Sequence, residues 1–352
     1  MLCDLVEEGW PSMELCAEAL LDRLAVEHRM VMVDRVRPPM RRRATRITPK
    51  GFNVDRFLNR FFDYPRVVRR LGGRYDAFHV VDHSYAHLVH ELPRERTGVF
   101  CHDLDTFRCL LGEEQRPRWF RAMTRRILSG MQEAAVVFCS TGPVRERLIQ
   151  LIDPGRIVQV PYGTAPEFTP ADGTPGGPPF LLHVGSCIER KRIDVLFETF
   201  AALRRERPDL GLTQVGGTFT KDQEEHARRL GIADAVTQTR GLDRARLAAL
   251  YRSAALVLQP SEREGFGLPV IEALACGAVV LASDIPVLRE VGGDAVVFAP
   301  VGDIASWSSA ARRLTLDREA APSRETRLAR ARLYSWSAHA RSIVEAYEKL
   351  SR

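Results

Sequence analysis

The sequence predicts an α/β protein of two domains, each built on a mainly parallel sheet, and three observations lead to this prediction. Short apolar runs alternate with amphipathic segments along the chain, which is the pattern of strands followed by helices. The 352 residues suffice for two domains with separate cores. Residues 162–179 are rich in Pro, Gly, Thr and Ala and indicate a linker between the two halves.

The individual elements follow from the same patterns. Strands are expected at residues 97–101, 134–140, 156–160, 180–184, 211–215, 236–239, 254–258 and 278–283. Helices are expected at residues 193–205 and 243–253, and an amphipathic helix at 335–352. The predicted divisions of the chain are therefore residues 1–165, 166–334 and 335–352. Sheets of this kind bind ligands beyond the carboxyl ends of their strands.

Composition excludes several classes of protein. Apolar content of 45% and charged content of 27% are ordinary for a soluble globular chain. No run of eighteen apolar residues exists, and acidic residues occupy the place where a secretion signal needs basic ones. The seven cysteines are odd in number and scattered, with no metal-ligand spacing, so a reduced, cytoplasmic compartment is expected.

The positive charge is carried almost entirely by arginine, with 47 arginines and four lysines. Because lysine is so rare, Lys191 is more informative here than it would be in another chain. Basic residues are densest in residues 34–50, which prolines interrupt. Two interpretations stay open for this segment: a solvated loop, or a contact with an anionic acceptor or an acidic membrane surface. No aromatic pattern accompanies the charge, so nucleic-acid binding is not expected.

The most informative stretch is residues 259–277, which predicts a strand, a glycine loop and a short helix. Two carboxylates, Glu264 and Glu272, flank a Gly-Phe-Gly turn. Pro269 suits the first turn of a helix and Gly277 suits its C-terminal end. Backbone N–H groups at a helix start attract phosphate, and carboxylates accept hydrogen bonds from the hydroxyls of a sugar or ribose. A solvated surface loop is the alternative.

This stretch resembles the donor-site signature of the retaining glycosyltransferases of family 4, which have the GT-B fold of two Rossmann-like, doubly wound domains facing across a cleft. The resemblance implies that Glu264 contacts the transferred sugar and Glu272 binds the nucleotide ribose. It also implies that the diphosphate is held by the loop amides of Gly265, Phe266, Gly267 and Leu268. In this family a C-terminal helix packs back toward the N-terminal domain.

Two further segments resemble donor motifs of the same family. Gly185 and Ser186 precede the basic pair Arg190 and Lys191, and cations suit the two phosphates of a nucleotide sugar. Relatives often carry an arginine where this chain has Ser186, which leaves the division of roles within the motif open. Gly241 and Leu242 follow a short strand and look like the loop that holds the nucleobase through its backbone. These residues do not indicate which base.

The first half offers one candidate, His102, directly after an expected strand. It resembles the family's cleft histidine, which lies near the transferred sugar; otherwise a histidine at a strand end is often structural. Asp103 and Asp105 form an Asp-x-Asp pair, which is weak evidence for a metal. GT-B enzymes generally lack such a metal, so none is expected.

The remaining candidates lie nearer the N-terminus. His83, His87 and His90 are spaced so that a zinc site is one interpretation and capping or surface roles are the other. Ser12, which follows Trp10 and a proline, is expected to cap a helix.

The resemblance and the residues together predict a glycosyltransferase that moves a sugar from a nucleotide-diphosphate sugar to a glycan, lipid-linked or small-molecule acceptor. Glu264, His102 and Lys191 are the expected catalytic residues, and no cofactor is expected. The alternatives are a non-catalytic nucleotide-sugar-binding protein, or a GT-B hydrolase or epimerase acting on a sugar nucleotide. A nicotinamide dehydrogenase is disfavoured because no Gly-x-Gly-x-x-Gly turn follows a strand.

Overall fold

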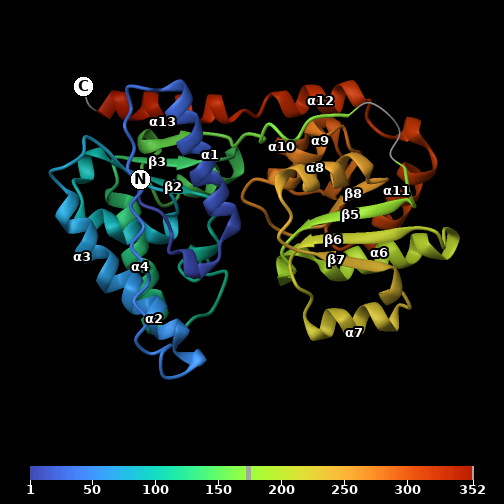
Figure 1. Cartoon of the computed structure of the whole chain (residues 1–352), viewed down its shortest axis with the longest axis horizontal. Helices are drawn as coiled ribbons and strands as arrows, with labels where there is room; N and C mark the ends of the chain where they lie inside the picture. Colours follow the sequence, from blue (N-terminus) through green and yellow to red (C-terminus); the bar gives the residue numbers. More distant parts are fainter. Residues whose placement is uncertain (172–175, 351–352) are drawn as a thin grey trace. The chain divides into compact units, whose positions relative to one another are not determined.

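The computed structural model describes residues 1–171 and 176–350 and divides the chain into two compact units (Figure 1). Unit 1 comprises Met1–Tyr162 and Trp336–Arg352, and unit 2 comprises Gly163–Ser335. The division lies a few residues from the boundaries expected after residues 165 and 334. Part of the expected linker, residues 172–175, lies outside the described residues.

Unit 1 is built on a parallel sheet in the order β1-β2-β3-β4. Its strands are β1 (Phe78–Val80), β2 (Thr97–Cys101), β3 (Val136–Cys139) and β4 (Ile157–Gln159). Leu2 extends the sheet by pairing in parallel with Val80 and with Val36. The first three strands are wholly buried, which explains why they are continuous apolar runs rather than alternating ones. The strands expected at residues 97–101, 134–140 and 156–160 are confirmed.

Helices cover this sheet, and the last of them comes from the far end of the sequence. The helices are α1 (Pro11–Glu27), α2 (Phe52–Leu58), α3 (Tyr64–Val68), α4 (Arg118–Glu133), α5 (Gly142–Leu148) and α13 (Trp336–Leu350). A long 3-10 helix, η5 (His83–Glu91), follows β1. The expected helix at 335–352 is α13, which buries Trp336 and Ile343 and contacts α1. The Tyr347 hydroxyl donates to the backbone oxygen of Phe78, 2.9 Å away, and so fastens α13 to β1.

The sequence led to expectations about two features near the N-terminus, the start of α1 and the basic segment 34–50. The helix α1 begins at Pro11 with Trp10 as its N-cap, so Ser12 lies inside the first turn and the expected cap is wrong. The basic segment 34–50 is mostly a loop, which is compatible with both of its interpretations. Buried Asp55 of α2 accepts backbone N–H groups from three successive residues of this loop, which holds the loop against the helix.

Unit 2 contains a six-stranded parallel sheet in the order β10-β9-β8-β5-β6-β7. The strands are β5 (Phe180–Gly185), β6 (Gly211–Gly216), β7 (Val236–Thr239), β8 (Leu256–Gln259), β9 (Val280–Ser283) and β10 (Val297–Ala299). The helices are α6 (Ile193–Glu206), α7 (Lys221–Arg229), α8 (Arg244–Ser253), α9 (Leu268–Ala275), α10 (Pro286–Gly292), α11 (Ile304–Leu316) and α12 (Arg324–Arg332). All the elements expected in this half are confirmed, with ends shifted by a residue or two.

The strand order of unit 2 reverses beside β5. The chain runs from β5 to β6 and β7 on one side and then returns to β8, β9 and β10 on the other. Open parallel sheets bind ligands at such a switch point, outside the carboxyl ends of the two strands. The loops that follow β5 and β8 are therefore the place to look for a site.

Two findings bear on the class of protein. Among the described residues no helix is long and apolar enough to cross a bilayer. All seven cysteines are buried, and none of them forms a disulfide bond with another described residue.

Candidate functional site

The loops after β5 and β8 bring together residues that are more than seventy positions apart in sequence. Arg190 and Lys191 lie in the 3-10 turn η9 (Glu189–Lys191), between β5 and α6. Glu264 lies in the loop between β8 and α9. The Lys191 Nζ donates to Glu264 Oε1 at 2.5 Å, and Arg190 Nη1 donates to Glu264 Oε2 at 3.2 Å. The structure thus places three candidate residues at the switch point of the sheet.

This ion-pair cluster is buried. Lys191 is 7% exposed, and the Glu264 side chain is equally shielded. Gln259, the last residue of β8, donates from Nε2 to Glu264 Oε1 at 2.7 Å. Burial alone would raise the pKa of Glu264, but the Lys191 and Arg190 charges outweigh it and lower the pKa to about 2. Glu264 is therefore an ionised carboxylate in a fixed position.

The cluster contains two cations and one anion, so it carries an excess positive charge. Arg190 is held twice, because Nη1 also donates to the backbone oxygen of Arg263 at 2.8 Å. A fixed guanidinium and a fixed ammonium beside one carboxylate suit an anionic group with several oxygens, such as a phosphate.

The second carboxylate, Glu272, has a different environment. It lies in α9, is 7% exposed, and accepts a hydrogen bond from the Tyr251 hydroxyl at 2.9 Å. Burial raises the pKa of Glu272 to about 7, because the hydrogen bond from Tyr251 and the charge of Arg244 offset the burial only in part. The two glutamates therefore differ in charge state near neutral pH, a difference that their spacing in sequence did not indicate.

The glycine loop between the glutamates has a backbone that only glycine adopts easily. Gly267 is the N-cap of α9 with φ of 104°, and a Cβ there would lie 2.7 Å from Leu288. Phe266 is buried and packs edge-on against Tyr334, with ring centroids 5.5 Å apart. Its side chain belongs to the core, so only its backbone is available to a ligand. Leu268 begins α9, and Pro269 lies in the first turn as expected.

The other expected donor residues line the same edge of the sheet. Gly185 ends β5 and Ser186 follows it, exposed. Gly241 and Leu242 lie in the loop after β7, and Asp243 caps α8. The structure places these residues at the carboxyl ends of β5 and β7, which lie on either side of β6, without assigning them a ligand.

Sequence reasoning missed His183 on β5. It is fully buried, and neither ring nitrogen has a hydrogen-bond partner among the described residues. Burial and the nearby Lys191 charge lower the pKa of His183 to about 3, so the ring is neutral. A Cβ built on Gly185 would lie 3.6 Å from both the His183 ring and the Lys191 side chain, which places the three residues together. No local pattern marks a histidine inside an apolar strand as a neighbour of the site.

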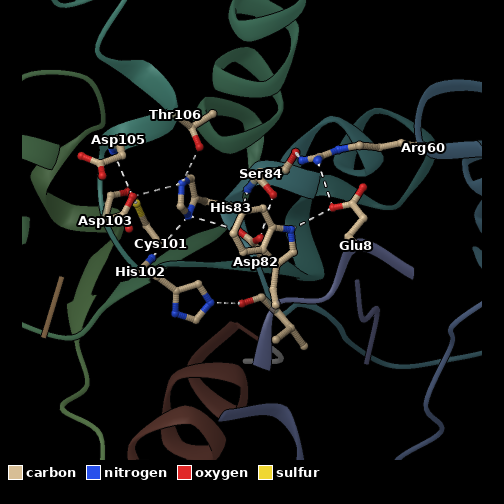
Figure 2. Close-up of polar contacts among 12 residues, drawn as sticks. Glu8, Arg60, Asp82, His83, Ser84, Cys101, His102, Asp103, Asp105 and Thr106 are labelled. Carbon is tan, nitrogen blue, oxygen red and sulfur yellow. Dashed lines mark hydrogen bonds and ion pairs between the residues drawn. The ribbon is translucent and has the colours of Figure 1, made fainter. Parts of the chain in front are cut away.

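In unit 1, His102 (Figure 2) follows β2 as expected. Both of its ring nitrogens have hydrogen-bond partners. The Nε2 lies 2.7 Å from the backbone oxygen of Val81. Because a carbonyl only accepts, Nε2 carries the proton, and Nδ1 accepts from the Tyr162 hydroxyl. Burial lowers the pKa of His102. A contact with a sugar would require His102 to exchange one of these partners.

The other histidines of unit 1 do not converge. His83 bonds to Thr106, His87 to the backbone oxygen of Arg60, and His90 to Glu133. Among the described residues no three His, Cys, Asp or Glu side chains are grouped so that they could hold a metal. These differing partners contradict the zinc interpretation. The expected surface role is also wrong for His83 and His87, which are buried.

Comparison with known proteins gives the class. Residues 165–331 match the family model described as Glycosyl transferases group 1. The chain is 31% identical over 294 residues to D-inositol 3-phosphate glycosyltransferase 2 of Catenulispora acidiphila, a match that covers 73% of this chain and 67% of that protein. It is 30% identical over 291 residues to the D-inositol 3-phosphate glycosyltransferase of Frankia alni, covering 75% and 68%. For several further relatives the match spans only about half of their length.

Solved structures of low identity share the fold. HepE of Anabaena, solved in complex with UDP and glucose, matches with a TM-score of 0.72 at 14% identity, over 99% of this chain and 98% of that one. Sucrose-phosphate synthase of Thermosynechococcus elongatus matches with a TM-score of 0.66 at 21% identity, over 91% and 85%.

Two parallel-sheet units of this kind, together with these structural neighbours, show the GT-B fold. The chain belongs to the group 1 glycosyl transferases and is a glycosyltransferase.

Proposed function

We propose that this enzyme transfers a sugar from a nucleotide-diphosphate sugar to a hydroxyl group of an acceptor, with retention of the anomeric configuration and without a metal ion. One observation carries the proposal: Glu264, a buried and ionised carboxylate, lies between Lys191 and Arg190 at the switch point of unit 2. A carboxylate accepts hydrogen bonds from sugar hydroxyls, while the cations beside it attract phosphate oxygens.

The diphosphate would be held by Lys191, Arg190 and the loop amides of residues 265–268. These groups stabilise the negative charge that grows on the leaving nucleotide as its bond to the sugar breaks. A metal ion often supplies that stabilisation in other phosphate chemistry. Here the excess positive charge of the cluster supplies it, which is why we propose a metal-independent reaction. Chelation by EDTA should leave turnover unchanged.

The nucleoside would lie toward Glu272 and the loop of Gly241 and Leu242. Glu272 accepts hydrogen bonds from the ribose hydroxyls in this proposal. Structural neighbours solved with UDP make uridine the first base to test.

The acceptor hydroxyl would attack the same face of the sugar that the nucleotide leaves. The bond between the anomeric carbon and the phosphate oxygen breaks, a bond to the acceptor oxygen forms, and the acceptor proton passes to the departing phosphate. No side chain is required as a nucleophile. Glu264 orients the sugar in this proposal. A sugar contact from His102 stays a prediction, because His102 Nδ1 would have to exchange its hydrogen bond with Tyr162 for one with the sugar.

The acceptor class is a glycan, a lipid-linked sugar or a small polyol. The relatives named D-inositol 3-phosphate glycosyltransferases make that compound the first acceptor to test.

The test is a panel of nucleotide-diphosphate sugars incubated with the purified protein. One of them should raise the melting temperature and be turned over to free nucleotide and a glycosylated acceptor. Glu264→Gln should lose at least about a hundredfold in turnover, while Glu225→Gln, an exposed change on α7, should not. Binding without turnover would support a non-catalytic protein, and release of free sugar or its epimer with every acceptor would support the hydrolase or epimerase alternative.

For the basic segment 34–50 we propose a peripheral contact with acidic membrane. Arg42, Arg46 and Lys50 are exposed and flank Ile47 in the sequence, and Ile47 is 87% exposed. Basic residues around an apolar one suit an anionic lipid surface. Co-sedimentation with vesicles that contain phosphatidylserine, and loss of it in Ile47→Ser, would test this; equal binding to neutral vesicles would contradict it.

A further inference from the structure

A small hollow opens at the carboxyl edge of the sheet in unit 1. Its polar lining residues are Asp4, Trp10, Glu14 and Arg37. Asp4 comes two residues after Leu2, which pairs in parallel with Val80 of β1. The hollow thus lies at the strand ends, where parallel sheets bind ligands. It is narrow, so it suits a single small group rather than a whole ring.

Asp4 is the most unusual side chain of this hollow. It is 7% exposed, and neither carboxyl oxygen accepts a hydrogen bond from a donor. Its neighbour is another carboxyl, Asp82, which follows β1 and accepts from the backbone N–H and the hydroxyl of Ser84 at 2.8 and 2.7 Å (Figure 2). Burial and the Asp82 charge raise the pKa of Asp4 to about 9, so Asp4 is protonated at neutral pH. The protonated oxygen of Asp4 donates to Asp82, so the other Asp4 oxygen remains as an acceptor.

Arg37 has a buried hydrogen-bond donor, whereas Asp4 has a buried acceptor. Its Nη1 donates to Glu14 Oε1 at 2.6 Å, but its Nε is buried without an acceptor. Two residues that line the hollow, Asp4 and Arg37, therefore carry buried polar atoms without a partner among the described residues: a carboxyl oxygen that can accept a hydrogen bond and a guanidinium N–H that can donate one. A hydroxyl group both donates and accepts, so one hydroxyl could satisfy both.

Trp10 provides an apolar surface beside these polar atoms. It is 53% exposed, yet its position is fixed because the indole N–H donates to Glu8 Oε2 at 3.2 Å. The Glu8 side chain is 1% exposed and is held in turn by Arg60 (Figure 2). A fixed, exposed aromatic ring next to groups that bind a hydroxyl suits a ring with polar edges and an apolar face.

We propose that this hollow is an acceptor subsite that binds one hydroxyl of a polyol ring, a sugar or a cyclitol. Asp4 accepts from that hydroxyl, Arg37 donates to it, and Trp10 packs against the face of the ring. The inference rests on the proposed function, because it gives the acceptor of that reaction a chemical class and a place on unit 1.

The experiment measures binding of polyols to the full-length protein by ligand-observed NMR in the presence of UDP. The probes are myo-inositol, D-inositol 3-phosphate, glucose and glucose 6-phosphate. At least one should bind the unaltered protein. Asp4→Leu and Trp10→Ala should each weaken that binding about tenfold or more, because each removes one of the contacts. Asp4→Asn, which keeps a neutral donor and acceptor, should bind within about threefold.

Two controls separate this inference from the proposed function. Trp119→Ala removes another exposed tryptophan, 65% exposed on α4, and should leave polyol binding unchanged. UDP affinity should be the same in every variant. Asp4→Leu is expected to fold, since it removes a buried carboxyl that lacks a donor. The inference would be overturned if none of the four polyols bound the unaltered protein. It would also be overturned if Asp4→Leu and Trp10→Ala bound a polyol as tightly as the unaltered protein does. Failure of UDP and every sugar nucleotide to bind would instead overturn the proposed function.

Discussion

At the scale of single residues, the pair of Lys191 and Glu264 is both structural and functional. Each charge is buried and compensated by the other, so neither is tolerable alone. Lys191→Met should destabilise unit 2 by about 3–5 kcal/mol, because it leaves Glu264 with Arg190 as its one cationic partner among the described residues. Urea unfolding measures this loss.

The double variant Lys191→Met/Glu264→Leu separates the two roles. Replacing both members of a buried pair by apolar groups should recover most of the lost free energy of unfolding, while sugar transfer stays absent. Arg192→Ala, which breaks the pair of Arg192 with the half-exposed Asp194, should change stability by about 1 kcal/mol or less. If the double variant were as unstable as Lys191→Met, burial of charge would not be the cause.

Glu272 predicts a pH dependence of nucleotide binding. Burial raises the pKa of this carboxyl to about 7, so it is protonated in slightly acidic solution. Ribose hydroxyls donate best to an ionised carboxylate, so nucleotide binding should release a proton near pH 7. UDP affinity should rise about tenfold between pH 6 and 8 and then level off. Calorimetry in two buffers of different ionisation enthalpy measures the proton directly.

The raised pKa of Glu272 makes stability fall with rising pH, whereas it makes UDP affinity rise. The contribution of Glu272 to folding is complete below 4.5, the ordinary value of a glutamic acid, and is lost as the pH rises through about 7. Glu272→Gln should abolish both the proton release and this loss of stability. A pH-independent UDP affinity in the unaltered protein would exclude a bond between Glu272 and the ribose.

At the scale of secondary-structure elements, the loop before α9 depends on one glycine. Gly267→Ala should lower the free energy of unfolding of unit 2 by about 2–4 kcal/mol, because it combines an unfavourable φ with a Cβ only 2.7 Å from Leu288. The displaced loop should also lose nucleotide affinity. Gly231→Ala is the matched control: its φ is also positive, at 69°, but a Cβ there has open space. It should lower stability by only about 1 kcal/mol and leave binding intact.

Elements set by local chemistry could be predicted from the sequence. Pro269 and Gly277 fixed the ends of α9, and the apolar runs on either side located β8 and β9. The expected cap at Ser12 failed because the dihedral angles of Trp10, not the residue type alone, decide where α1 begins. Local propensity thus located elements better than it located their caps.

Contacts set by strand order could not be predicted in the same way. His183 lies near Lys191 because the turn η9 returns to the end of β5, whereas Asp4 lies near Asp82 because the segment of Leu2 is adjacent to β1. The pairing of Glu264 with Lys191 has the same origin, since it joins the ends of β8 and β5. The sequence motifs indicated which residues matter, whereas the charge states of Glu264 and Glu272 depend on neighbours that only the fold supplies.

At the scale of the whole molecule, unit 2 is one continuous stretch of chain and unit 1 is not. Unit 1 is completed by α13, which buries Trp336, His339 and Ile343 after the chain has passed through all of unit 2. Each large apolar side chain that is fully buried contributes about 1.5–3 kcal/mol, and a whole domain is stable by only about 5–15 kcal/mol. Unit 1 therefore should not fold without α13.

A chain that ends at Ser335 tests this dependence. Unit 1 should lose its cooperative unfolding transition and expose the surface that α13 covers, while unit 2, with its ion-pair cluster intact, should still bind UDP. Urea titration with and without UDP distinguishes the units, because ligand shifts only the transition of the unit that binds it. In the full chain, Ile343→Asp should reproduce the loss and Glu345→Ala, exposed on the same helix, should not. If the shortened chain kept the unfolding transition of unit 1, α13 would be dispensable for folding. If the shortened chain lost UDP binding together with the fold of unit 1, the nucleotide site would not be contained in unit 2.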